Sequence, residues 1–412
     1  MTENQKRFVG LDVHKQYVMV GAVNGTQEMV LPPRKVSLVE FEGWAKKHLR
    51  PSDEVVLEAT TNAWYLYDLL EPLVERVVVC HPPQVKLIAA AFVKTDKKDT
   101  MTLAKLLAVG MIPAVWVPPL HVRELRGLIN HRQRLISQQT RLKNRLQSLL
   151  HRQHVLPPGG QLFAAANRAW WLGLSLSSSE KLRLRQDLIL LDQLAPLITE
   201  VETEINRLSL AEPWAELTPY LLQLPGIGLL TAMTILSAIG DIRRFPSAKK
   251  LVGYAGLGAK IHASGQTHRT GGITKQGRKE LRAILVEAAW IAIRYNQRWQ
   301  EQFEHLAFRI GRQKAIVAIA RKLLVVIWHV LSAKVADRKA DPQQVARFFI
   351  SWGRQLRVKT TVGLKASEFA RQQLDRLELG QELERVAYGN VTYCLPPAAQ
   401  AQPPDQPAAV QA

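Results

Sequence analysis

The stretch FVGLDVHK, residues 8–15, decides the fold of the N-terminal region. It is a short apolar run that ends at Asp12, as expected of a buried strand with a polar side chain at its carboxyl end. Three strand-like runs in a meander, followed by strands separated by helical runs, predict an α/β domain over residues 1–117, with a mixed sheet covered by helices. The further strand-like runs are YVMVGAV, EMVL, EVVLEAT and RVVVCHP.

Four carboxylates occupy the ends of these elements. Asp12 ends the first strand, Glu58 ends the fourth, and Asp96 and Asp99 open a helix in KTDKKDT. Carboxyl ends of neighbouring strands converge on one rim of a sheet, and residues three apart at a helix start face the same way. Such a cluster of oxygen ligands suits two Mg²⁺ or Mn²⁺ ions that assist phosphoryl transfer. We therefore predict that these four residues bind metal.

Three lysines surround the aspartate pair, and we expect Lys94, Lys97 and Lys98 to meet the phosphates on which the metal ions act. Each carboxylate also has an ordinary structural explanation. Asp96 can cap its helix, and the other carboxylates can be first-turn or strand-end charges. Their placement on these element ends favours a common site.

The whole chain of 412 residues carries 55 Lys and Arg against 35 Asp and Glu, a formal net charge of +20. Such an excess indicates a polyanionic partner, with nucleic acid preferred over an anionic membrane surface. No uninterrupted apolar run approaches the roughly 18 residues of a spanning helix, and MTENQKRF does not resemble a signal peptide. Cys80 and Cys394 lie far apart, which supports neither a disulfide framework nor a zinc site. We expect a cytoplasmic prokaryotic protein, associated with the nucleoid.

A basic helical segment is expected over residues 118–212. Residues 121–154 have helical spacing and a net charge of +7, and VLPPGG at 155–160 ends the first helix. A second amphipathic stretch at 179–208 is expected to return antiparallel, as a helical hairpin or coiled coil. This segment is either a solvated spacer or a surface for nucleic acid or another subunit. Its candidate nucleic-acid contacts are Arg141, Lys143 and Arg145.

Residues 213–340 form the next predicted domain, which is mostly helical. LPGIGLL places Gly226 and Gly228 between two helical runs, where a tight turn leaves backbone N–H groups free for a phosphate oxygen. This arrangement resembles a helix-hairpin-helix motif, although a plain turn between packed helices also explains it. Residues 341–394 look like a helical extension, and the Pro-, Ala- and Gln-rich tail at 395–412 is predicted to be disordered.

Ser264 lies in a basic, glycine-rich stretch of the same domain. Residues 243–282 hold ten Lys and Arg against one acidic residue, and Lys275 and Arg282 stand at the head of a helix. An exposed hydroxyl among phosphate-binding cations can attack a phosphodiester. Most loop serines are turn residues, however, and no general base can be assigned. The nearby candidate bases are His262 and His268.

Five motifs, in order and spacing, resemble the DEDD-type transposases of the insertion-sequence one-ten family, in particular its eleven-eleven subgroup, which also includes pilin-gene invertases. The motifs are FVGLDVHK, VVLEAT, KTDKKDT, LPGIGLLTAMTILSAIGDIRRF and HASGQTHRTGGITKQGRKELR. The likeness covers residues 7–330. Two positions depart from the family pattern, since Thr100 stands where alanine is usual and Arg278 stands where asparagine is frequent.

The resemblance implies an N-terminal domain of the RuvC-like, ribonuclease-H type, a coiled-coil segment, and a C-terminal transposase domain whose nucleophile is Ser264. It places the metal-binding tetrad on Asp12, Glu58, Asp96 and Asp99. It also implies a homo-oligomer, a dimer or tetramer, in which a noncoding bridge RNA pairs with donor and target DNA. A covalent phosphoserine link would conserve the phosphodiester energy, so that no ATP is needed.

We therefore expect an Mg²⁺-dependent DNA transposase or site-specific recombinase. One alternative is a metal-dependent nuclease or Holliday-junction resolvase, in which the carboxylates act by hydrolysis and Ser264 is only a turn residue. Another is a packaging protein that binds nucleic acid by charge alone, with a steep salt dependence and no strand breakage. GLDVHK also resembles the first strand of actin-like ATPases, but the sequence lacks a convincing second phosphate loop.

Overall fold

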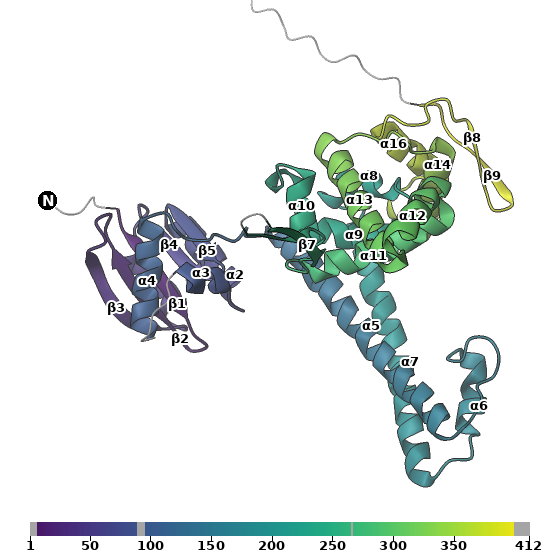
Figure 1. Ribbon diagram of the computed structural model, residues 1–412, viewed down its shortest axis with the longest axis horizontal. Coiled ribbons are helices and arrows are strands. Elements are labelled where there is room, and N and C mark those ends of the chain that lie inside the picture. Colours follow the sequence, from purple (N-terminus) through teal and green to yellow (C-terminus); the bar gives the residue numbers. More distant parts are fainter. Residues whose placement is uncertain (1–5, 89–94, 265–266, 399–412) are drawn as a thin grey trace, which may run out of the picture. The chain divides into compact units, whose positions relative to one another are not determined.

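The computed structural model describes residues 6–88, 95–264 and 267–398, and Figure 1 shows its ribbon. The chain divides into two compact units, Met1–Pro119 and Leu120–Ala412. The first unit combines a mixed sheet with helices, and the second is mostly helical. The predicted combination of an α/β domain with a helical remainder is confirmed at this level.

The sheet of the first unit has five strands in the order β3-β2-β1-β4-β5. β1, β2 and β3 form an antiparallel meander, and β4 and β5 extend the sheet in parallel on the other side of β1. The parallel pairs are joined through helices, because a tight turn cannot connect parallel strands. The strands are β1 (Phe8–Val13), β2 (Tyr17–Val23), β3 (Met29–Ser37), β4 (Glu54–Glu58) and β5 (Arg76–Cys80).

Helices cover both faces of this sheet, because its central strands are buried on both sides. On one face, apolar side chains of β1, β2 and β4 pack against Phe41 and Trp44 of α1 and Leu66 of α2. On the other face, Val56 and Val78 pack with Leu103 and other side chains of α3 and α4. The helices are α1 (Phe41–His48), α2 (Ala63–Leu70), η1 (Glu71–Leu73), α3 (Pro82–Ile88) and α4 (Asp96–Ala108).

A long antiparallel hairpin opens the second unit, with α5 and α7 side by side (Figure 1). Leucines at helical spacing, such as Leu135, Leu142, Leu184 and Leu191, form its core. The predicted helical hairpin therefore exists, and its tip carries two further short helices. The elements are α5 (Leu120–Arg152), η2 (Ala165–Asn167), α6 (Arg168–Leu172) and α7 (Ser178–Leu208).

A helical bundle with one β-hairpin follows. α13 packs against α8, α10, α11 and α12, and α9 packs against α8, α11 and both hairpin helices. The elements are α8 (Trp214–Leu222), α9 (Leu229–Ile239), η3 (Ile242–Arg244), α10 (Ala248–Tyr254), β6 (Ala259–Ser264), β7 (Thr267–Ile273), α11 (Lys279–Tyr295), α12 (Gln297–Ile310) and α13 (Arg312–Ala333).

Within the described residues, α13 is the one helix long and apolar enough to cross a membrane, and half of its apolar window is buried inside the protein. Arg321 and Lys322 interrupt its apolar run, so the sequence shows no uninterrupted spanning segment there. Its buried side chains, which include Ile319, Leu323 and Ile327, make it a core element of the second unit.

The expected helical extension at 341–394 is only partly helical. α14 (Pro342–Gln355), α15 (Val358–Thr361) and α16 (Ala366–Arg376) are followed by a β-hairpin of β8 (Arg385–Tyr388) and β9 (Val391–Cys394). The prediction was wrong for these last residues. VAYGNVTY has the alternation and the Gly-Asn turn of a short hairpin, a signal that the helical interpretation passed over.

Candidate active site

The sheet register places Asp12 beside Glu58. Leu11 of β1 is paired with Leu57 of β4, and the two carboxylates are the next residues along these parallel strands. Both side chains belong to the face covered by α4, because Gly10 and Val56, each two residues earlier, face that helix. This register places the two strand ends side by side, and a shared metal site at this rim stays a prediction.

Gly10 allows α4 to lie directly on β1. A Cβ atom at Gly10 would stand 2.1 Å from the carbonyl oxygen of Thr100 and 3.0 Å from the amide nitrogen of Ala104. Thr95 caps the helix, its side chain accepting a hydrogen bond from the Lys98 amide. The close packing and the cap together fix the first turn of α4, which carries Asp96 and Asp99.

Asp12, His14 and Asp96 come together at this point. His14 Nε2 lies 3.1 Å from Asp12 Oδ2 and 3.4 Å from Asp96 Oδ2. Tyr17 of β2 donates a hydrogen bond from its hydroxyl to Asp96 Oδ2 at 2.8 Å, and its ring stacks on that of His14 with centroids 4.5 Å apart. The buried Thr100, the first departure from the family pattern, donates from Oγ1 to the Asp96 carbonyl oxygen at 2.8 Å.

The pKa values of the two aspartates in this cluster are shifted in opposite directions. Burial raises the pKa of Asp12, and the carboxylates of Asp96 and Asp99 raise it further against the opposing effect of His14. The hydrogen bond from Tyr17 lowers the pKa of Asp96, assisted by His14 and Lys35. A buried carboxylate held among other carboxylates is destabilised in its ionised form, which a bound cation would relieve.

Glu58 and Asp99 are the other two predicted metal ligands. The charge of Asp99 acts on Asp12, as described, and that of Glu58 acts on Cys80, its partner across β4 and β5. Burial, with a further contribution from Glu58, raises the pKa of the Cys80 thiol to about 12, so this cysteine stays a neutral, buried thiol.

The donor set suits a divalent cation. Asp12, His14 and Asp96 each offer a ligand atom, and these three atoms lie within 4.8 Å of one another. Lys97 and Lys98 are exposed at the start of α4, where they are accessible to a polyanion. Lys94, the third lysine of the prediction, lies outside the described residues. The sequence patterns did not predict His14 or Tyr17 as part of this site. His14 lies two residues after Asp12, a predicted ligand, and this spacing is a signal that could have indicated it.

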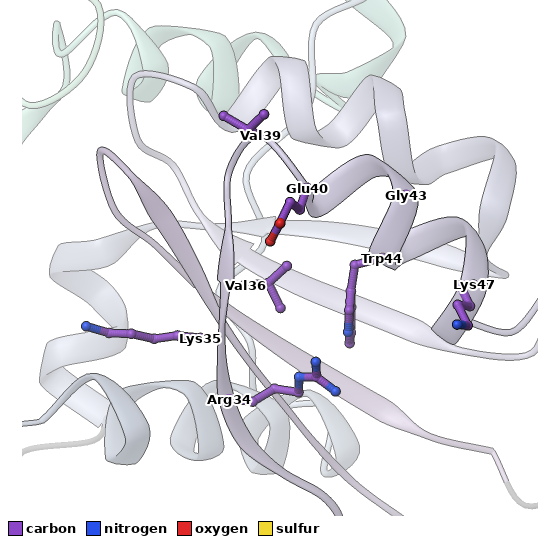
Figure 2. A pocket seen from close by; sticks show the side chains of 8 residues that line it. All are labelled: Arg34, Lys35, Val36, Val39, Glu40, Gly43, Trp44 and Lys47. Carbon is purple, nitrogen blue, oxygen red and sulfur yellow. The ribbon is translucent and has the colours of Figure 1, made fainter.

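Lys35 is a further cation on this side of the sheet. Its Nζ lies 4.1 Å from the centroid of the Tyr17 ring. Figure 2 shows a hollow beside β3 whose lining includes Arg34, Lys35, Trp44 and Lys47, and in this view the side chain of Lys35 extends away from Trp44. Successive side chains of β3 point to opposite faces of the sheet. Arg34 therefore lies over the Trp44 ring, whereas Lys35 lies near the acidic cluster, where its charge helps to lower the pKa of Asp96.

Ser264 ends β6 and is exposed. It is paired with Thr267 of β7, which places it at the end of a two-stranded antiparallel ribbon. The side chains of His262 and His268, the candidate bases, lie outside the described part. Arg282 donates from Nη1 to the carbonyl oxygens of Ala255 and Lys275, so this predicted nucleic-acid contact fastens the base of the ribbon.

The second departure from the family pattern, Arg278, also lies at the base of the ribbon. It donates from Nε to the Tyr254 hydroxyl at 3.1 Å, and its amide donates to the Tyr254 carbonyl oxygen. Burial pushes the pKa of Tyr254 upward, but the charges of Arg278, Arg244 and Arg126 outweigh it and leave that pKa lowered. Burial also lowers the pKa of Arg126 to about 10. These contacts tie α5, α10 and the start of α11 together.

The two glycines of the helix-hairpin-helix-like turn have different surroundings. Gly226 has φ +83°, and a Cβ there would stand 2.2 Å from the Ala288 carbonyl oxygen of α11. Gly228 is exposed at the start of α9, and no atom of the described residues lies within 4 Å of such a Cβ. Packing therefore explains Gly226, and only Gly228 has the open backbone that a phosphate contact would need.

The predicted basic contacts of the hairpin also differ. Arg145 Nη2 lies 2.5 Å from Asp187 Oδ1 of α7, and Lys143 donates to Gln139 Oε1 at 3.2 Å. Arg141 is exposed on α5. Lys275 is exposed beyond the β-ribbon, with φ +56°.

Comparison with known proteins identifies the family. A protein-family model for the DEDD transposases of IS110 elements, described as "Transposase", matches residues 9–155. A second family model, described as "Transposase IS116/IS110/IS902 family", matches residues 218–304. The Sinorhizobium fredii protein y4qE is 28% identical over 233 residues, 57% of this chain and 57% of that protein.

Two relatives cover more of their length. The transposase for insertion sequence element IS1111A of Coxiella burnetii is 26% identical over 296 residues, 69% of this chain and 79% of that protein. The pilin gene-inverting protein of Moraxella bovis is 26% identical over 343 residues, 79% of this chain and 96% of that protein. The family that the five motifs indicate is thereby confirmed: the chain belongs to the IS110 family of transposases and is a DNA transposase or recombinase.

Proposed function

We propose that this protein is the recombinase of an insertion sequence, that it requires Mg²⁺ or Mn²⁺, and that it exchanges DNA strands through Ser264. The observation that carries the proposal is the cluster at the ends of β1 and α4, where Asp12 and Asp96 converge within 3.4 Å of His14. The strand order and this placement of carboxylates support the RuvC-like assignment of the first unit.

The four carboxylates would hold the divalent ions, which supply charge stabilisation to the reacting phosphate. The residues in this role are Asp12, Glu58, Asp96 and Asp99. The exposed Lys97 and Lys98 would bind the phosphate backbone beside the cluster. Tyr17 and Thr100 would position Asp96, one through its carboxylate and the other through its carbonyl oxygen.

Ser264 would act as the nucleophile. Its Oγ would form a bond to phosphorus as one P–O bond to deoxyribose breaks, the serine proton passing to a base or water and the departing sugar oxygen taking up a proton. Attack by a hydroxyl of the other strand would then reverse these changes and free the serine. The exposure of Ser264 at the end of the ribbon supports this role, because a phosphodiester can reach it there.

The partners of the reaction would be donor DNA, target DNA and a structured bridge RNA, bound by a homo-oligomer in the cytoplasm. The net charge of +20 supports binding of several polyanions. Guidance by RNA follows from the resemblance to the family alone. Arg141, Lys275 and Gly228, which are exposed, would contact these partners in addition to Lys97 and Lys98.

A covalent-trapping assay tests this function. The full chain would be mixed with Mg²⁺, circular-junction donor DNA, target DNA and RNA transcribed from the flank of the element, then denatured and resolved for protein linked to DNA. Wild type and a control variant, Ser332→Ala at an exposed serine of α13, should form the link. Ser264→Ala should not.

The alternatives give different products in the same assay. DNA cut without a link, or cut equally well by Ser264→Ala, would replace the serine mechanism by the hydrolytic nuclease or resolvase. Salt-sensitive binding without any strand breakage in Mg²⁺ would indicate a packaging protein. Asp12→Ala in parallel reports whether the metal site is needed before the link forms.

A further inference from the structure

His14 stands where a metal ligand would stand. Its Nε2 is 3.1 Å from Asp12 Oδ2 and 3.4 Å from Asp96 Oδ2, and it belongs to the one group of described residues whose ligand atoms lie close enough to hold an ion. A plain hydrogen bond explains its contact with Asp12. The same nitrogen also lies within ion-pair distance of Asp96, a second carboxylate on another element.

Metal coordination accounts for both distances. Neighbouring ligands of an octahedral ion with metal–ligand distances of about 2.2 Å lie about 3.1 Å apart. The two separations at His14 Nε2 are close to this span. An ion bound here would therefore need only small movements of Asp12, Asp96 and His14.

The surroundings of His14 hold its ring in this orientation. The ring stacks on Tyr17 at 4.5 Å with an interplanar angle of 26°. Tyr17 is itself held by its hydrogen bond to Asp96 and lies under Lys35 Nζ. The histidine side chain is 35% exposed, so water and ions can reach it.

We propose that His14 is a direct metal ligand through Nε2, together with Asp12 and Asp96, and that its nitrogen makes the site prefer Mn²⁺ to Mg²⁺. Mg²⁺ favours oxygen ligands, whereas transition-metal ions such as Mn²⁺ accept an imidazole nitrogen more readily. A mixed set of nitrogen and oxygen donors therefore raises the affinity for Mn²⁺ relative to that for Mg²⁺. This inference rests on the metal site of the proposed function and adds a ligand beyond the four carboxylates.

Pulsed electron paramagnetic resonance of Mn²⁺ bound to the full chain tests the inference without measuring activity. A directly bound imidazole gives nitrogen hyperfine coupling, which we expect in wild type and in His131→Gln, a control at an exposed histidine of α5. The coupling should be absent in His14→Gln, with Mn²⁺ affinity lowered about 10-fold. His14→Asp replaces nitrogen by oxygen, so it should bind Mn²⁺ without the coupling and lower the ratio of Mn²⁺ to Mg²⁺ affinity.

Two results would overturn the inference in distinguishable ways. Mn²⁺ bound by wild type without nitrogen coupling, or with coupling that persists in His14→Gln, would leave the carboxylate site standing and remove His14 from it. Failure of wild type to bind Mn²⁺ any better than Asp12→Asn would remove the metal site itself, and the proposed function with it.

Discussion

The acidic cluster of the first unit and the serine ribbon of the second unit are built in opposite ways. Asp12 and Asp96 are fixed by a strand end, a capped helix, a close glycine contact and hydrogen bonds from Tyr17 and His14. Ser264 is exposed at the end of a two-stranded ribbon, and Arg278 and Arg282 make hydrogen bonds at the base of that ribbon.

This difference matches what each chemistry requires. A metal site needs several ligands held at once in fixed geometry, which packed elements supply. A nucleophile that attacks a large substrate must be exposed. The groups that accept its proton or position the phosphate can belong to the nucleic acid or to another part of the protein. The same contrast between packed and open groups recurs in the turn at 225–228 and in the helical hairpin, and the following predictions test it.

The largest effect is expected at the packed carboxylate. Asp12→Asn should reduce DNA strand exchange by about 10³-fold or more, the scale seen when a transition-state charge contact is lost. The variant should nonetheless unfold at a higher temperature than wild type in chelator at neutral pH. Burial and neighbouring carboxylates raise the pKa of Asp12, so its ionised form destabilises the metal-free native state.

The pH dependence gives the sign of that stability difference. The folded pKa of Asp12 lies above the ordinary value of 3.8. Ionisation of Asp12 therefore lowers the free energy of unfolding as the pH rises through the folded pKa, and it has no such effect below pH 3.8. The gain in melting temperature of Asp12→Asn should therefore shrink as the pH falls toward 4. A variant less stable than wild type across this range would show that the Asp12 carboxylate is satisfied without metal.

The turn at 225–228 offers the next largest effect. Gly226→Ala should lower the free energy of unfolding by about 2–4 kcal/mol, because the new Cβ would meet α11 at 2.2 Å and the residue would keep φ +83°. Gly228→Ala, with open space around it, should cost less than about 1 kcal/mol. Denaturant unfolding measures both values.

DNA binding separates the two interpretations of this turn. If Gly228 bounds a phosphate site, Gly228→Ala should weaken binding more than it weakens folding. Equal binding by wild type and Gly228→Ala would reduce the helix-hairpin-helix-like motif to a turn between packed helices.

Gly10→Ala tests whether the packing of α4 on β1 determines the geometry of the acidic cluster. Gly10→Ala should cost about 1–3 kcal/mol of stability, because its Cβ would meet the Thr100 carbonyl oxygen at 2.1 Å and α4 would have to shift. That shift should also weaken Mn²⁺ binding. Gly43→Ala in α1 is the control, since its Cβ has open space and alanine favours a helix by about 1 kcal/mol. Unchanged Mn²⁺ affinity in Gly10→Ala would mean that α4 position does not govern the site.

The sequence was sufficient for the parts of this site that depend on strand periodicity. Asp12 and Glu58 follow from the ends of apolar runs, and Asp96 from a helix start. His14 and Tyr17 could not be found in that way, because their role depends on how the β1–β2 turn lies against α4. Likewise, the exposed position of Ser264 depends on strand pairing, which a glycine-rich stretch with weak alternation does not reveal.

Substitutions in the helical hairpin are expected to have the smallest effects. They compare a group held by an ion pair with an exposed group on the same helix. Arg141 is exposed, whereas Arg145 is paired with Asp187 across the hairpin. If the hairpin binds nucleic acid, Arg141→Ala should reduce the slope of log affinity against log salt by about 1, with little loss of stability. Arg145→Ala should cost at most about 1 kcal/mol of stability, since exposed ion pairs contribute little.

Arg145→Ala should also change the salt slope less than Arg141→Ala does, because Asp187 already neutralises that guanidinium. Filter binding over a salt series with donor DNA and with RNA gives both slopes. Equal slopes for wild type and Arg141→Ala would make the hairpin a spacer or a subunit contact. A larger change for Arg145→Ala would mean that its ion pair opens when nucleic acid binds, so that a group held by the fold in the free protein is released to the partner.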